Sequence, residues 1–171
     1  MSVLVEAFSV VLKHETVANR FCGGMKRFAA LVPNTTFCTD QELVRVGFMS
    51  PDDVGKFIEL LGTHGIRYVV DGVAQDVIVI DQQQGPLVPC NWINAFYFDI
   101  EDDPDRRVVA CMLADGKERR LSVPHGWQHP GQFGIVRTEN SDEDLEFLRH
   151  ENGLDVFFNR RTGKEVYVGR I

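Results

Sequence analysis

The chain lacks any run of about 18 consecutive apolar residues, the length that a membrane-spanning helix requires. Its first residues, Met1 to Leu12, contain no basic region and carry Glu6 inside the apolar run, which is unlike a secretory signal peptide. Only four of the 171 residues are cysteine, and they are scattered, so we expect reduced thiols and no disulfide framework. The sequence therefore predicts a cytoplasmic protein without a membrane segment.

An excess of positive charge is also missing. The chain has 18 Lys and Arg against 25 Asp and Glu, which gives a formal net charge of −7. Nucleic-acid binding depends on cationic side chains placed against phosphate, and so does attachment to anionic membranes, so both classes of function are disfavoured. The acidic balance is compatible with solubility alone or with a basic protein partner.

Signatures of catalysis and of cofactor binding are missing as well. The sequence contains no Gly-x-Ser-x-Gly motif, no phosphate-binding loop and no glycine-rich dinucleotide fingerprint. The acidic turn from Asp99 to Asp105 fails the EF-hand pattern, because Pro104 stands where glycine is required and Ala110 stands where glutamate is required. We therefore predict no catalytic residue, no metal and no cofactor, and the expectation leans towards a protein that is not an enzyme.

The clearest local pattern that the chain does contain is a capped helix. The run from Ser50 to Asp53 supplies a hydroxyl cap, a proline at the first helical position and two carboxylates in the first turn. Apolar side chains follow at i, i+3, i+4 and i+7: Val54, Phe57, Ile58 and Leu61. This spacing predicts a helix with one apolar stripe that begins at Ser50 and ends near Gly62 or Gly65.

Strands surround this helix in the first half of the chain. Runs of β-branched residues predict strands at Val3–Leu12, Leu43–Phe48, Arg67–Val70 and Val77–Asp81, the last two joined as a hairpin around Asp71-Gly72. Residues 15–32 have helical spacing that Gly23-Gly24 interrupts, which predicts one kinked helix or two short ones. These elements form a β-α-β-α-β-β layer, with both helices on one face of the sheet.

After residue 86 the sequence is typical of β structure. It predicts a three-stranded meander of Ala95–Ile100, Arg107–Leu113 and Arg119–Val123, and later a hairpin of Asp155–Asn159 with Glu165–Val168. Asn140 or Ser141, followed by acidic residues, predicts a short capped helix through about Arg149. We therefore predict an α+β fold. It has a strand-helix half at residues 1–86 and a mainly antiparallel half with one short helix at residues 87–171, within one compact body.

Three segments carry a resemblance to known sequences. Gly47 to Val54, Asp81 to Pro86 and Gly153 to Arg170 resemble signatures of small uncharacterised bacterial proteins, and this resemblance implies no activity. Residues 44–86 are similar to one βαβββ module of the vicinal-oxygen-chelate (glyoxalase-like) superfamily. The strand positions that carry metal ligands in that superfamily hold Val44, Val46, Ile78 and Ile80 here. The resemblance therefore implies the shape of the unit and not a metal enzyme.

Consecutive polar residues after a buried strand are the first candidates for a binding site. Gln82, Gln83 and Gln84 follow the apolar run Val77–Asp81, and their amides are suited to hydrogen-bond a ligand or a partner backbone. A polar exit loop is the plainer interpretation of the same residues. Trp92 lies shortly after them and is a candidate contact at the junction between the two halves.

A second candidate region contains two histidines. His125 and His129 are four residues apart, a spacing that would place both imidazoles on one face of a helix and allow zinc binding. Pro124, Gly126 and Pro130 prevent such a helix, so the sequence favours a loop anchored by Trp127 over a metal site. His125, Trp127 and His129 are therefore candidate contacts for a ligand or partner, with no metal predicted.

Two functional interpretations follow. The first is a binding or protein-interaction module of the inhibitor or immunity type, which carboxylates at Asp99–Asp105 and Asp142–Asp144 would steer onto a basic partner. The alternative is a small-molecule-binding protein or enzyme with its site in the cleft between the two halves, where the Gln82–Gln84 loop acts with His125 or His129. Self-association through the edge of the last hairpin, residues 155–168, is a further hypothesis.

Overall fold

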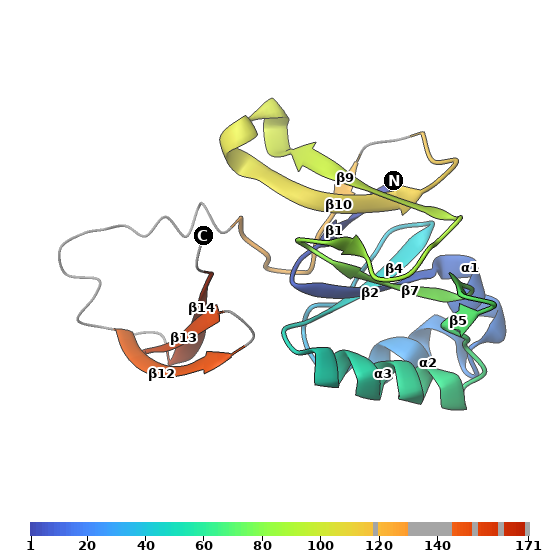
Figure 1. The fold of residues 1–171 in the computed structure, drawn as a ribbon, viewed down its shortest axis with the longest axis horizontal. Coiled ribbons are helices and arrows are strands. Elements are labelled where there is room, and N and C mark those ends of the chain that lie inside the picture. The colour runs from blue at the N-terminus through green and yellow to red at the C-terminus, as the bar shows by residue number, and fades with distance from the viewer. Residues whose placement is uncertain (118–119, 130–144, 152–153, 161–162, 170–171) are drawn as a thin grey trace. The chain divides into compact units, whose positions relative to one another are not determined.

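The computed structural model describes residues 1–117, 120–129, 145–151, 154–160 and 163–169 (Figure 1). The chain forms two compact units, Met1–Trp127 and Gln128–Ile171. Helices and mainly antiparallel strands are both present, which confirms the predicted α+β class. The boundary expected near residue 86 lies inside the first unit, because strands from before and after that residue pair in the same sheet.

Two sheets build most of the first unit. A five-stranded antiparallel sheet has the order β3 (Cys38–Thr39), β4 (Leu43–Phe48), β2 (Phe8–Lys13), β7 (Val77–Asp81) and β8 (Gly85–Pro86). A four-stranded sheet has the order β11 (Leu121–Ser122), β1 (Ser2–Val5), β10 (Arg107–Leu113) and β9 (Ile93–Asp99). A small hairpin joins β5 (Val69–Val70) to β6 (Val73–Ala74), and two short 3₁₀ turns connect β9 to β10.

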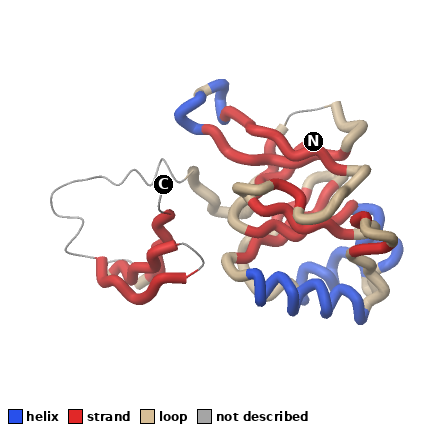
Figure 2. Tube along the Cα trace, in the orientation of Figure 1, coloured by secondary structure: helices blue, strands red, loops and turns tan. Residues whose placement is uncertain are grey.

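Three helices cover one face of the five-stranded sheet, as Figure 2 shows. They are α1 (His14–Arg20), α2 (Gly24–Leu31) and α3 (Pro51–Thr63). The predicted start of α3 is confirmed, because the Ser50 hydroxyl accepts a hydrogen bond from the Asp52 N–H at 3.2 Å. The glycine pair separates α1 from α2, and Gly23 adopts a left-handed backbone with φ of +87°. The alternative of two short helices is therefore the correct one.

The five-stranded sheet is buried on both faces. One apolar cluster lies between this sheet and the helices and includes Phe28, Phe57 and Leu61. A second cluster lies between the two sheets and includes Val3 and Ile78. The first unit therefore has three layers, and this explains why β2, β4 and β7 are almost continuously apolar in sequence.

The prediction of a single strand at Val3–Leu12 is wrong, because this segment forms two strands in different sheets. β1 pairs with β10, whereas β2 pairs with β4 and β7. The chain turns between them at Ala7, whose φ is +45°. The strands before and after this turn are buried on both faces, so the sequence pattern resembles that of a single buried strand.

Two predicted strand pairings are also wrong. The turn at Asp71-Gly72 joins β5 to β6, and Val77–Asp81 is instead an interior strand that pairs with β2 and β8. The predicted meander does not form, because Leu121–Ser122 pairs in parallel with β1 and not with β10. The antiparallel pairing of β9 with β10 is confirmed. β1 takes the place beside β10 that was predicted for residues 119–123, and the apolar residues of β1 are buried there.

The second unit contains a three-stranded antiparallel sheet of β12 (Leu145–Glu151), β13 (Leu154–Asn159) and β14 (Lys164–Gly169). The predicted hairpin of β13 and β14 is confirmed. The helix predicted through Arg149 is wrong from residue 145 onward, since cross-strand pairs such as Phe147 with Phe157 place this segment in the sheet. Residues 140–144, where that helix would begin, lie outside the described residues. None of the helices in the described part of the chain has the length and apolar content of a membrane span.

Candidate functional site

The three glutamines form the turn between β7 and β8. The Gln82 side-chain oxygen accepts a hydrogen bond from the Ala7 N–H at 3.0 Å, and the Gln82 N–H donates to the Ala7 carbonyl at 2.8 Å. The N–H groups of Gln83 and Gln84 donate to the Asp81 carboxylate at 2.7 and 3.3 Å. All three glutamines are exposed. The Gln82 amide therefore closes the turn at Ala7, and Asp81 fixes the backbone of the other two.

The candidate residues near the end of the first unit have different surroundings. Trp127 is half-buried, and its indole N–H donates to the Glu6 carboxylate at 2.9 Å. His125 is exposed, whereas His129, which belongs to the second unit, is buried. In the described part of the chain, no group of three or more His, Cys, Asp or Glu residues is arranged to hold a metal ion.

Gln82 and Trp127 lie near each other, but Trp92 does not lie with them. Gln82 contacts Ala7 and Trp127 contacts Glu6, so both hold the turn between β1 and β2. Trp92 lies at the other end of β2, where its ring is 5.4 Å from the Lys13 ammonium. The candidate residues of the first unit therefore do not converge on one site.

Trp92 instead lines a groove at the end of the first unit. The groove has a volume of about 560 Å³ and is open to solvent. Its walls come from both sheets and from α1. They are Lys13 at the end of β2, Glu15 in the first turn of α1, Gln41 and Glu42 before β4, Asn91 and Trp92 before β9, and Leu113 to Asp115 at the end of β10. A second depression of about 460 Å³ shares Gln41, Glu42, Leu113 and Asp115 with it and is also lined by Lys117, and we refer to the two adjacent depressions together as the trough.

The indole of Trp92 is held in a fixed position within this trough. The indole N–H donates to the Ala74 carbonyl at 3.3 Å, and the backbone carbonyl of Trp92 accepts from the Ala114 N–H at 3.0 Å. Glu42 is paired with the Met1 amine at 3.1 Å. Lys13 forms no ion pair with any described residue, and its ammonium is attracted to the electron-rich face of the Trp92 ring.

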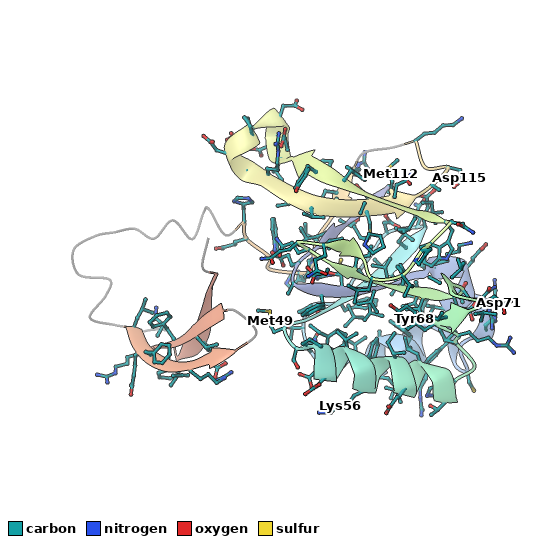
Figure 3. The ribbon with its side chains drawn as sticks, viewed as in Figure 1. Met49, Lys56, Tyr68, Asp71, Met112 and Asp115 are labelled. Carbon is teal, nitrogen blue, oxygen red and sulfur yellow. The ribbon has the colours of Figure 1, made fainter. Side chains whose placement is uncertain are left out.

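A second exposed feature lies at the far end of β9, on the hairpin that β9 forms with β10. Tyr97 is 73% exposed, and the Arg107 guanidinium lies 5.8 Å from its ring centre. Arg107 donates two hydrogen bonds to the Asp99 carboxylate, at 2.7 and 3.1 Å. These hydrogen bonds lower the pKa of Asp99 and raise the pKa of Arg107. Figure 3 shows Asp115 at the opposite end of β10 from this tip.

The tip of the hairpin has an unusual backbone. Glu101 and Asp102 are consecutive non-glycine residues with φ of +56° and +58°. Arg106 forms an ion pair with Glu101, and the Asp103 carboxylate accepts the Asp105 N–H at 3.0 Å. These contacts fix a conformation that side-chain-bearing residues rarely adopt.

A buried arginine is the polar feature that the sequence analysis missed. Arg45 is 1% exposed, and its guanidinium donates to the Ser9 hydroxyl at 3.0 Å and to the carbonyls of Thr36 at 3.1 Å and Glu6 at 3.2 Å. Burial lowers the pKa of Arg45, and the nearby Cys38 and Glu6 oppose that shift. An arginine within the apolar run of β4, two residues before Gly47, is the only sequence signal of this cluster.

The cysteines divide by exposure. Cys22 is exposed, whereas Cys38 and Cys111 are buried between the sheets. Burial raises the pKa of the Cys38 thiol to about 11, and burial also raises the pKa of Cys111. A thiol with a raised pKa is a poor nucleophile at neutral pH, so these two side chains act as small core residues.

Comparison of the chain with protein-family models, with curated proteins and with solved structures returned no match. The candidate regions are therefore the trough beside Trp92 and the β9–β10 hairpin, each defined by its own geometry.

Proposed function

We propose that the protein is a non-enzymatic interaction module that binds a basic protein partner through the β9–β10 hairpin. The observation that supports this proposal is the pair of Tyr97 and Arg107, which presents an exposed aromatic ring beside a guanidinium that is already fixed. Tyrosine and arginine are enriched among the residues that contribute most to protein–protein binding. Because Asp99 holds Arg107 in place, little side-chain freedom remains to be lost on association.

The charge of the hairpin supports a basic partner. Residues 99–107 contain five carboxylates and two guanidiniums, which leaves a local charge of −3. Asp99 and Glu101 are each paired with an arginine. Asp102 and Asp105 are exposed, and neither side chain forms an ion pair with another described residue. The unpaired carboxylates favour encounter with a positively charged surface, and the aromatic ring then supplies buried area.

An inhibitor or immunity-type role is the form of this proposal that the hairpin favours. A rigid acidic tip with one large aromatic side chain is suited to enter and cover a basic site on another protein. The Asp142–Asp144 carboxylates lie outside the described residues, so the argument depends on the hairpin alone.

Site-specific crosslinking in the native cell tests the proposal. A photoreactive phenylalanine analogue replaces Tyr97 in one variant and Val69 in a control variant, since Val69 is also exposed (45%) but lies in β5. We expect a covalent adduct with one basic protein at position 97 and none at position 69. Adducts at neither position, equal adducts at both positions, or an acidic partner at position 97 would contradict the proposal.

Measurements with that purified partner then separate charge from packing. Asp102→Lys should weaken binding about tenfold or more, because it reverses a charge at the tip. Glu59→Lys makes the same change on the exposed side of α3 and should leave the dissociation constant within about twofold. Tyr97→Ala should weaken binding at both low and high salt, whereas the effect of Asp102→Lys should shrink as salt rises.

A further inference from the structure

The trough beside Trp92 is independent of the hairpin. Trp92 precedes β9 and Tyr97 is its fifth residue, so the two features lie near opposite ends of that strand. Its larger part, about 560 Å³, is within the usual range of small-ligand sites, roughly 300–1,000 Å³. The trough is therefore large enough for a small molecule or a short peptide, and its walls belong entirely to the first unit.

The trough holds opposite charges that do not neutralise each other. Lys13, Glu15 and Asp115 all line it, and none of the three forms an ion pair with another described residue. The Lys13 ammonium is instead positioned over the Trp92 ring. Opposite charges that share one groove without pairing are complementary to a ligand that also carries both charges.

Ligands of a single charge fit these walls less well. Lys13 already occupies the face of the ring at which a free cation would bind, and its ammonium would repel that cation. A purely anionic ligand would face the carboxylates of Glu15 and Asp115. Gln41 and Asn91 add amide groups that can donate to or accept from a peptide backbone.

We infer that the trough binds a short peptide with free termini, whose carboxylate pairs with Lys13 and whose ammonium pairs with Glu15 or Asp115. Leu113 and Ala114 supply the apolar part of the wall against which the middle of the peptide lies. The second depression extends the trough towards Lys117, which gives room for more than one residue of ligand. The site requires no chemistry, only recognition of two ligand ends of opposite charge.

The intrinsic fluorescence of Trp92 gives a direct test. The chain has two tryptophans, so Trp127→Phe leaves Trp92 as the single reporter. The probe is a pool of tripeptides without tryptophan and with free termini, and two matched pools are acetylated at the amine or amidated at the carboxylate. Calorimetry with the unaltered protein repeats each titration. We expect saturable binding of the free pool, and at least tenfold weaker binding of both blocked pools.

Variants of the wall complete the test. Lys13→Met keeps an unbranched side chain but removes the ammonium. It should weaken binding of the free pool at least tenfold and leave binding of the amidated pool unchanged. Asp115→Asn should reduce the preference for a free amine. The control is Lys56→Met, which removes a lysine on the outer side of α3 (Figure 3) and should leave the binding of all three pools unchanged. No binding of the free pool, equal binding of the blocked pools, or an unchanged affinity in Lys13→Met would overturn the inference.

Discussion

At the scale of single residues, Arg45 shows how one buried polar side chain organises several turns. Its guanidinium contacts Ser9 on β2 and the carbonyls of Thr36 and Glu6 in two different loops. No carboxylate among the described residues is paired with it. A buried cation in this position remains tolerable only because each nitrogen has an acceptor, so the site is sensitive to any change that moves the guanidinium.

Substitution of Gly47 should disturb this arrangement. A Cβ atom at Gly47 would lie 2.5 Å from Arg45 Nη2 and 2.8 Å from its Cζ, closer than atoms can approach. We expect Gly47→Ala to lower the free energy of unfolding by about 2 kcal/mol or more, through overpacking and displaced hydrogen bonds. Urea denaturation followed by circular dichroism measures the change.

A second glycine provides the control with the opposite sign. Gly55 lies within α3, and nothing lies within 4 Å of the position that its Cβ would occupy. Gly55→Ala should stabilise the protein by about 0.5–1 kcal/mol, because alanine is the better helix former. A Gly47→Ala protein as stable as wild type would show that the guanidinium relaxes without loss.

We expect the buried Cys38 thiol to make the folded protein less stable in alkaline solution. Its pKa is raised by burial from 9.0 to about 11, so the folded state favours the protonated thiol. The resulting stabilisation is fully present below about pH 9 and is lost as the pH rises towards about 11, at up to about 1.4 kcal/mol per pH unit. We expect Cys38→Ala to reduce the fall in unfolding free energy between pH 8 and 10.5, measured under reducing conditions.

Only the slope with pH is informative in that comparison, because Cys38→Ala also leaves a small cavity that shifts stability at every pH. The exposed Cys22 offers a matched control, and Cys22→Ala should leave the slope unchanged. Identical slopes in wild type and Cys38→Ala would argue against a desolvated thiol at this position.

The candidate site shows the limits of sequence at this scale. The sequence predicts Trp92 as a contact at the junction between the two halves, and in the structure its ring lines the trough of the first unit. Nothing local in the sequence distinguishes Lys13 and Asp115 from other surface charges. They meet Trp92 only through the pairing of strands that are distant in sequence, so neither composition nor spacing carries a signal of the trough.

At the scale of elements, the sequence predicts a helix or strand correctly where the signals that specify it lie within its own residues. α3, β4 and β7 agree with prediction because caps, helical spacing and β-branched runs lie within each segment. Pairing partners were mispredicted for β5 and β11, since the choice of neighbour depends on strands far away in sequence. The break at Ala7 was missed because alanine does not normally mark a turn with positive φ.

The cap of α3 gives a prediction for an element. The Ser50 hydroxyl satisfies the Asp52 N–H, which would otherwise lack a partner at the helix terminus. Ser50→Ala should lower the free energy of unfolding by about 1 kcal/mol, whereas Ser50→Thr keeps an acceptor and should cost less than half of that. Chemical denaturation at equilibrium compares the two variants. Equal losses in both would mean that the hydroxyl does not act as the cap.

At the scale of the whole molecule, the three-layer arrangement of the first unit decides where function can reside. Its central strands are covered by helices on one face and by the second sheet on the other. A ligand can therefore reach the central strands only at their ends, whereas Arg45 and the buried thiols inside the layers are covered. The trough lies at such strand ends, and the Tyr97 surface lies on the hairpin between β9 and β10.

Amide hydrogen exchange should reveal this layering. Val10 to Leu12, Val44 to Val46 and Val77 to Val79 are fully or almost fully buried and lie in strands with neighbours on both sides. Their amides can exchange only when both apolar clusters open, so they should share one free energy equal to that of global unfolding of the first unit. The two-residue edge strands β3 and β8 should exchange faster through local opening. Residue-resolved exchange measured by NMR distinguishes the cases. Slow exchange in β2 with fast exchange in β7 would mean that β7 separates from its neighbour β2 without global unfolding, and the sheet would then not be one cooperative unit.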